Sequence, residues 1–372
     1  MAADRLYLDH AATTPMLPAA QAAMVGAMAS WANPSSPHAD GRAARAMLEN
    51  ARARIASALG WTGHVIFTSG ASEAIAIGLL RAKVGRIVTS PVEHDAVLRV
   101  TKGAARLAVD HSGIVQTPVR AEPVETPSFL AANKDGPSTG SAQTDDRFVL
   151  AIQHVNNETG VIQPLDRIER DGAVLFADCA QSAGKLPLPD ADMIAISAHK
   201  FGGPPGIGAL LLRDLALIEP SGGQEQGYRA GTENLPAILS MAAALEARED
   251  WLPRATALRA RLDAGIEAAG GVVVARDAPR LPAIASYRMP GVSARAQLIQ
   301  FDMAGISVSA GSACSSGSLK TSHVLGAMGW DEAAASEVVR VSFGPQTCDN
   351  DLDRFLAAWT AMAAKASGRA SR

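Results

Sequence analysis

The sequence predicts an α/β fold, in which a large domain with a mostly parallel, buried sheet is followed by a smaller α+β domain. Short apolar runs alternate with helical patterns through the first two thirds of the 372 residues, as in a parallel sheet covered by helices. Near residue 250 this alternation ends, and strand patterns follow one another more closely. The chain is 48% hydrophobic and 19% charged, so it can bury a substantial core.

The first region supplies helices and strands in turn. Gly60 ends the second helical pattern, as glycine commonly does. The expected helices cover residues 18–30, 39–59, 71–80, 234–249 and 252–269. The expected strands cover residues 64–68, 86–89, 148–152, 174–177, 193–197 and 208–212, and they are apolar throughout because helices cover both faces of such a sheet.

The second region has its own strands, at residues 271–275, 284–288, 306–309 and 338–343, with helices at 294–303 and 349–364. We place the large domain at residues 16–250 and the small domain at residues 1–15 and 251–372. Residues 121–146 are rich in helix breakers and small polar residues, so we expect a mobile surface insertion without a catalytic role.

Composition and charge exclude several classes of function. The formal net charge is −3 and no basic run occurs, which argues against nucleic-acid binding. No stretch of roughly 18 apolar residues predicts a membrane span, and the first residues lack the pattern of a secretory signal. Cys179, Cys314 and Cys348 are too scattered for a disulfide framework or a metal site. We therefore expect a cytoplasmic protein without a metal.

Lys200 is the strongest single candidate for chemistry. It follows the apolar run 193–197 and opens a loop rich in glycine and proline. A lysine that forms a Schiff base must be partly desolvated and held by its surroundings, and the end of a buried strand provides both. The alternative is a solvated lysine at a turn.

Asp178 ends another apolar run, 22 residues before Lys200. A carboxylate directly after a buried strand is costly unless it meets a cation. The pyridinium nitrogen of pyridoxal phosphate (PLP) is such a cation, and an aspartate keeps it protonated. The alternative is a helix N-cap.

Three more polar clusters follow predicted strands. The turn before Ala71 and Ser72 contains glycine and leads into a helix, so its N–H groups could bind a phosphate. His94 could stack on a flat cofactor, although a lone histidine is more often structural. Asn156 and Asn157 are poor strand residues, which favours a polar role. Ligands of open α/β sheets bind beyond the carboxyl ends of the strands, where all these clusters fall.

Cys314 lies among small and flexible residues, at 309–318. Buried structural cysteines have bulky apolar neighbours, so we expect an exposed cysteine on a loop that can move, where its thiolate could react. The alternative is an incidental cysteine in a linker.

Together these segments resemble cysteine desulfurases of the iron–sulfur-cluster and nitrogen-fixation type, within the class-V, fold-type-I PLP enzymes. The resemblance covers nearly the whole chain. Besides the clusters above, it includes residues 7–15 (YLDHAATTP), 33–38 (NPSSPH), 222–225 (GGQE), 229–234 (RAGTEN) and 340–344 (RVSFG). It implies a large domain with a mostly parallel seven-stranded sheet and a smaller α+β C-terminal domain that carries the Cys314 loop.

The resemblance also implies a role for individual residues. Lys200 matches the lysine that forms the internal aldimine with PLP and moves the Cα proton, and Cys314 matches the nucleophile that forms a persulfide. His94 matches the residue that stacks on the ring and acts in proton transfer. The other cofactor-binding matches are Asp178, Gln181, Ala71, Ser72, Asn157, Ser197, His199 and, from the neighbouring subunit, Thr232. Asn157 and Arg340 match the groups that bind the substrate carboxylate. His10 is a departure, since asparagine is common at its position.

The implied reaction converts L-cysteine to L-alanine and leaves a persulfide on Cys314 for a sulfur acceptor, such as an iron–sulfur scaffold protein. The resemblance implies a homodimer. Two alternatives stay open. The chain could be another class-V PLP enzyme, such as an aminotransferase or a selenocysteine or cysteine-sulfinate lyase, or a degenerate scaffold that relays sulfur without turnover.

Overall fold

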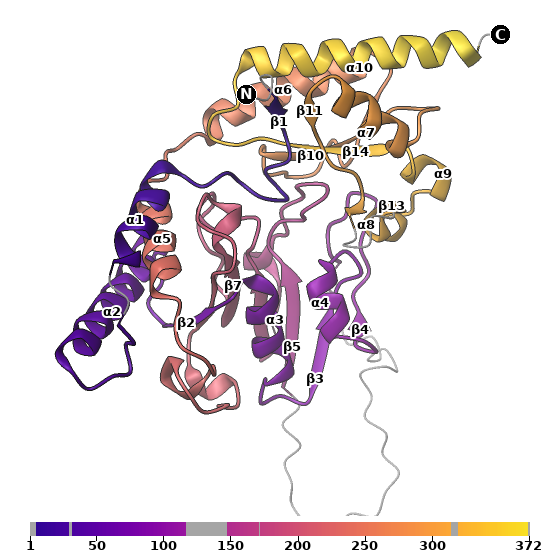
Figure 1. The fold of residues 1–372 in the computed structure, drawn as a ribbon. Coiled ribbons are helices and arrows are strands. Elements are labelled where there is room, and N and C mark those ends of the chain that lie inside the picture. The colour runs from indigo at the N-terminus through magenta and orange to yellow at the C-terminus, as the bar shows by residue number, and fades with distance from the viewer. Residues whose placement is uncertain (1–4, 30–31, 117–146, 171, 314–318, 371–372) are drawn as a thin grey trace, which may run out of the picture.

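The computed structural model describes residues 5–29, 32–116, 147–170, 172–313 and 319–370 (Figure 1). The expected insertion at 121–146 and Cys314 both lie outside these residues. Among the described helices, none is long and apolar enough to cross a membrane.

A seven-stranded sheet forms the centre of the molecule and confirms the predicted fold class. Its strand order is β2-β8-β7-β6-β5-β3-β4, and only β8 runs antiparallel to its neighbours. The strands are β2 (His64–Thr68), β3 (Arg86–Thr89), β4 (Ala105–Arg106), β5 (Phe148–Gln153), β6 (Val174–Asp178), β7 (Met193–Ser197) and β8 (Gly208–Leu212). Every residue of β6, β7 and β8 is buried, which explains why their sequences are apolar up to Asp178 and Ser197 at the ends of β6 and β7.

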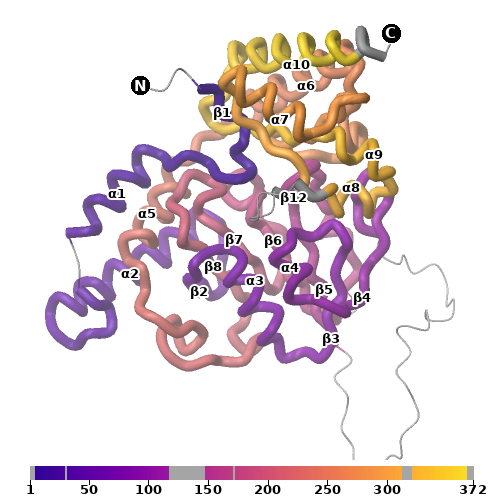
Figure 2. The backbone as a smooth tube through the Cα atoms, turned by 45° about the vertical axis from the view of Figure 1, so that its right-hand side comes forward, coloured from indigo at the N-terminus to yellow at the C-terminus, as the bar shows by residue number. Residues whose placement is uncertain are grey.

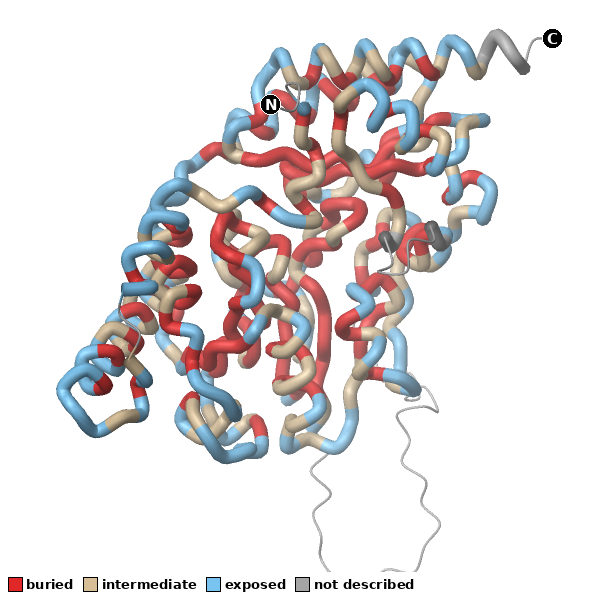
Figure 3. Tube along the Cα trace, in the orientation of Figure 1, coloured by how far each residue is buried: buried red, intermediate tan, exposed pale blue. Residues whose placement is uncertain are grey.

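Helices cover both faces of this sheet. One face packs against α3 (Ala71–Leu80) and α4 (Asp95–Val100). The other packs against α1 (Pro18–Met28), α2 (Ala39–Leu59) and α5 (Leu235–Glu246). Figure 3 shows the buried strands between these helices, whose outer surfaces are exposed.

A second, smaller core lies above the carboxyl ends of the central strands (Figure 2). Its antiparallel sheet has the order β14-β10-β9 and packs against three helices. These elements are β9 (Val272–Val273), β10 (Ile284–Arg288), β14 (Val338–Ser342), α6 (Leu252–Ala268), α7 (Ala294–Met303) and α10 (Asp349–Ala370). The rings of Phe301 and Phe355 stack 4.8 Å apart inside it.

The chain's N-terminal segment belongs to the same core. β1 (Leu6–Tyr7) pairs in parallel with β11 (Ile306–Ser307), and Asp9 bridges to Ser342. The other short strands and α-helices are β12 (Ser312–Ala313), β13 (Leu319–Lys320), α8 (His323–Ala327) and α9 (Glu332–Ala335), and the 3-10 helices are η1 (Leu165–Arg167), η2 (Ala198–Lys200), η3 (Leu215–Leu217) and η4 (Glu225–Gly227). The segment that follows β1 starts beside the second sheet, where Asp9 bridges to Ser342, and then passes over the carboxyl end of β7, where Ala11 and Ala12 accept from Lys200.

Some predicted boundaries were wrong. The strand expected at 271–275 shortens to β9 because Ala275 has φ 50°, which ends the extended backbone. The strand expected at 306–309 is only two residues long, although Ser309 still bridges to Arg340. The last helix continues to Ala370 instead of ending at 364. The division into domains near residue 250 stays a prediction.

Candidate active site

The predicted polar clusters meet at one edge of the central sheet. Asp178 is the last residue of β6, Lys200 ends the short 3-10 helix after β7, and His94 follows β3. Gln181, just after β6, and Lys200 both donate to the carbonyl oxygen of Ala11, which joins the segments that follow β6 and β7. The charges of Asp178 and Lys200 also act on the pKa of His94. Asn157 follows β5 at the same edge.

Lys200 is held beneath the N-terminal segment. Its Nζ donates to the carbonyl oxygens of Ala11 at 2.6 Å and Ala12 at 2.9 Å. Burial, and then the nearby charge of Arg340, lower the pKa of Lys200 to about 8, while Asp178 and Asp9 raise it. Near neutral pH a useful fraction of this amine is therefore neutral and nucleophilic.

Asp178 is buried, with 6% of its surface exposed. Its Oδ1 accepts from the N–H of Ala180 at 2.9 Å, and its other oxygen accepts no hydrogen bond from the described residues. Burial raises the pKa of this carboxyl above its usual value, and the charges of His94 and Lys200 offset only part of that rise. A carboxylate with one free oxygen in a desolvated site is suited to a cationic ring nitrogen.

Two further predicted ligands flank this carboxylate. Gln181 donates from Nε2 to the oxygen of Ala11 at 2.9 Å, and its buried Oε1 has no partner among the described residues. His94 accepts from the N–H of Ala96 through Nδ1 at 3.1 Å, which orients its ring. Although this histidine is solvent-accessible, the protein packed around it excludes enough water to lower its pKa. Both side chains thus keep a polar edge for a ligand.

The predicted phosphate cradle is the N-terminus of α3, where the carboxylate of Glu73 already accepts from the N–H of Ser69. α3 starts after Gly70, whose φ is 154°, and no side chain caps it. A Cβ on Gly208 would lie 2.7 Å from the Cα of Gly70, so glycine is required for this close approach. Ser197 lies beside the same turn, and Ser72 is exposed in the first turn of α3. The free N–H groups there suit an anion.

Arg340 reaches the site from β14 of the second sheet. Its Nη2 donates to Asp9 Oδ1 at 2.7 Å, and its Nη1 donates to the backbone oxygen of Asn157 at 3.0 Å. Its Nε is buried without a partner among the described residues. The guanidinium is thus oriented by two contacts and retains donors for a carboxylate.

The two adjacent asparagines differ in their surroundings. The amide of Asn156 is buried and serves its own loop, since it donates to Val92 and accepts from the N–H groups of Glu158 and Thr159. Asn157 is only partly buried, and its backbone contacts Arg340. Of the pair, Asn157 is the one available to a ligand.

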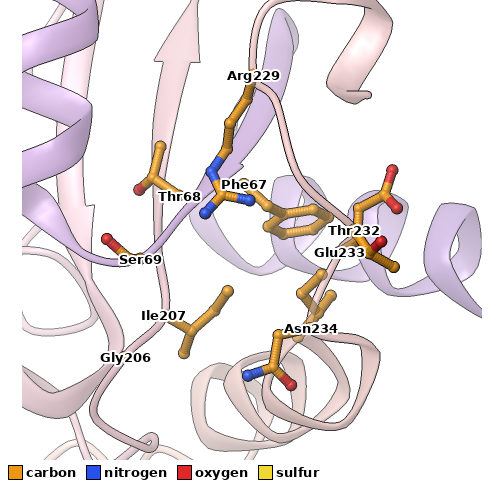
Figure 4. Close-up of a pocket in the computed structure, with 10 residues that line it drawn as sticks. Phe67, Thr68, Ser69, Gly206, Ile207, Arg229, Thr232, Glu233 and Asn234 are labelled. Atoms are coloured by element: carbon orange, nitrogen blue, oxygen red, sulfur yellow. The ribbon is translucent and has the colours of Figure 1, made fainter. Parts of the chain in front are cut away.

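The remaining predicted ligands lie on the side of β8. His199 contacts Thr13 through its Nδ1 at 2.8 Å. Thr232 is exposed and lines a cavity of about 160 Å³ with Ser69, Arg229 and Glu233 (Figure 4). The carboxylate of Glu233 is buried there without a partner among the described residues.

Sequence reasoning missed two residues of the site. Asp9 lies within residues 7–15, where no local pattern singles it out, because its partner Arg340 is 331 residues away. Lys185 was not considered, although its Nζ donates to the backbone of Lys200 at 2.8 Å. Its spacing of four residues from Gln181 was the available signal.

The chain is similar to known proteins over almost its whole length. The aminotransferase class-V family profile matches residues 6–355. An IscS-like cysteine desulfurase of Mycobacterium tuberculosis is 36% identical over 384 residues, with 94% of each chain covered. The cysteine desulfurase IscS of Dictyoglomus turgidum is 35% identical and covers 94% of this chain and 92% of its own.

A solved structure also has a similar fold. A NifS-like protein from Rickettsia africae superposes with a TM-score of 0.82 at 28% identity, covering 96% of this chain and 99% of its own. The resemblance inferred from the sequence is thereby confirmed, and with it the fold. The chain belongs to the class-V aminotransferase family.

Proposed function

We propose that this chain is a PLP-dependent cysteine desulfurase, which converts L-cysteine to L-alanine and carries the sulfur as a persulfide on Cys314. The observation that carries the proposal is the placement of Asp178 and Lys200 at the carboxyl ends of the neighbouring strands β6 and β7, where Gln181 and Lys200 donate to the same carbonyl oxygen of Ala11. Burial lowers the pKa of the Lys200 amine. The curated relatives, named as cysteine desulfurases, support the substrate.

The residues at the sheet edge fit PLP. Lys200 would hold the cofactor through its amine, Asp178 would hold the ring nitrogen, and Gln181 and His94 would contact the ring. Ala71, Ser72, Ser197, His199 and a neighbouring subunit's Thr232 would bind the phosphate. When bound, PLP supplies an electron sink for negative charge at the substrate Cα.

The chain's own residues would then handle the substrate. Arg340 and Asn157 bind its carboxylate, and Asp9 orients Arg340 for this contact. Lys200 takes the proton from Cα. The thiolate of Cys314 attacks the substrate sulfur, so a new S–S bond forms as the C–S bond breaks; the electron pair of that bond stays with the carbon fragment, which takes up a proton to become alanine.

The persulfide would pass to a sulfur acceptor, such as an iron–sulfur scaffold protein. We propose a homodimer in the cytoplasm. Another class-V activity would use Lys200 and Asp178 equally well but would leave Cys314 idle. A scaffold without turnover would not require an amine whose pKa is lowered to about 8.

Alanine and sulfide release from L-cysteine tests the proposal, with Cys314→Ala as the variant and Cys348→Ala, at an exposed free cysteine, as the control. We expect the wild type and the Cys348 variant to release both products in the presence of a thiol reductant. The Cys314 variant should lose both. Full activity of the Cys314 variant would exclude the persulfide role, and an inactive wild type that binds PLP would favour another class-V reaction.

A further inference from the structure

A second lysine, Lys185, lies directly behind the proposed cofactor site. Its Nζ donates to the backbone oxygen of Gln181 at 3.0 Å and to the backbone oxygen of Lys200 at 2.8 Å. These oxygens belong to different loops, one after β6 and the other after β7. No step of the proposed reaction uses this amine.

Burying the charged amine of Lys185 at this position costs free energy. Burial, and then the charge of Lys200, lower the pKa of Lys185 to about 7. The two carbonyl contacts offset part of this cost, because hydrogen bonds from a cation are stronger than those between neutral groups. The carbonyl of Lys200 also accepts from the hydroxyl of Thr14 at 3.2 Å, whereas among the described residues the carbonyl of Gln181 accepts from Lys185.

We propose that Lys185 is a positioning residue, which ties the loop that carries Gln181 to the loop that carries Lys200 by bridging their carbonyl oxygens. The inference rests on the proposed function, in which both residues hold PLP. The bridge sets the position of the Lys200 amine relative to the ring that Gln181 contacts. An apolar side chain at position 185 cannot form this bridge, because it has no hydrogen-bond donor.

Four variants separate this bridge from a general role in folding. Lys185→Met removes both contacts. Thr14→Val leaves the Lys185 contacts in place and removes the other donor to the Lys200 carbonyl, together with a longer contact of the same hydroxyl to the carbonyl of His10. Lys102→Met changes an exposed lysine as a control. Lys185→Arg keeps a cation that can donate to two oxygens. Thermal unfolding of each apoprotein identifies variants that do not fold.

The first readout is hydrogen exchange in the apoprotein, which needs no cofactor. We expect Lys185→Met to speed exchange in both loops, at residues 179–186 and 198–203, and Thr14→Val to speed it in the second loop alone. Unchanged exchange in both loops would overturn the proposal, as would equal effects of the two variants. If Lys185→Met does not fold, Lys185→Arg decides: wild-type exchange in both loops supports the bridge, and faster exchange in a folded Arg variant overturns it.

The second readout is PLP affinity and the position of its visible absorbance band. We expect Lys185→Met to bind PLP about tenfold more weakly with a shifted band, and Lys185→Arg to recover most of the affinity. Affinity and band equal to those of the wild type would contradict the proposal. If the wild type itself binds no PLP, the proposed function fails, while the exchange experiment still decides the bridge.

Discussion

Replacing Asp9 by asparagine tests whether the second sheet orients the substrate-binding group. Arg340 is 7% and Asp9 21% exposed, and their ion pair spans 2.7 Å. Truncating one partner of a buried charge pair costs about 2–5 kcal/mol. Asparagine still offers an oxygen acceptor and the site is partly hydrated, so we expect the lower end, about 2 kcal/mol, or a loss of roughly 30-fold in kcat/KM for cysteine.

The assay is steady-state alanine formation over a range of cysteine concentrations. The loss should fall mainly on KM, because Arg340 binds the carboxylate in both the ground state and the transition state. Asp302→Asn is the control, since it removes a surface ion pair with Arg5. The charge of Asp9 also raises the pKa of Lys200, so the variant should lower that pKa. Kinetics within twofold of the wild type would refute the orienting role of Asp9.

Three other predictions follow from the structure. Because the pKa of Lys200 is lowered to about 8, PLP uptake by the apoprotein should speed up as pH rises toward 8 and level off above it, measured by stopped-flow absorbance; a flat profile would contradict this. Glu225→Gln breaks the buried bidentate pair with Arg52 and should cost about 3 kcal/mol in urea unfolding, against less than about 1 for the exposed Glu246→Gln. Gly208→Ala would place a Cβ against the carbonyl oxygen of Ile196 in β7 and 2.7 Å from the Cα of Gly70 in the turn before α3, so PLP binding should weaken about tenfold or more, and unchanged binding would refute the close approach.

The position of the site could be predicted because strand ends carry local signals. An aspartate or a lysine after an apolar run is unusual in any sequence, and parallel strands bring such residues to one edge. Asp178, Lys200 and His94 were found in this way. The same reasoning could not find Asp9, since its pairing with Arg340 depends on how the second sheet packs over the first.

Other features of the site could not be predicted from the sequence because they depend on backbone atoms. The amines of Lys185 and Lys200 donate to backbone carbonyl oxygens, and no side-chain pattern in the sequence encodes such partners. The adjacent amides of Asn156 and Asn157 look equivalent in the sequence, yet one closes its own loop and the other remains accessible. Loop conformation, which depends on the surrounding packing, makes that difference.

Trapping the cofactor on the protein tests the central claim most directly. Borohydride reduction of the PLP-loaded protein, followed by peptide mass spectrometry, reports which amine holds PLP. The account predicts a single pyridoxyl adduct on Lys200 and its loss in Lys200→Ala. An adduct on Lys185 instead, or none on the peptide that contains Lys200, would contradict it.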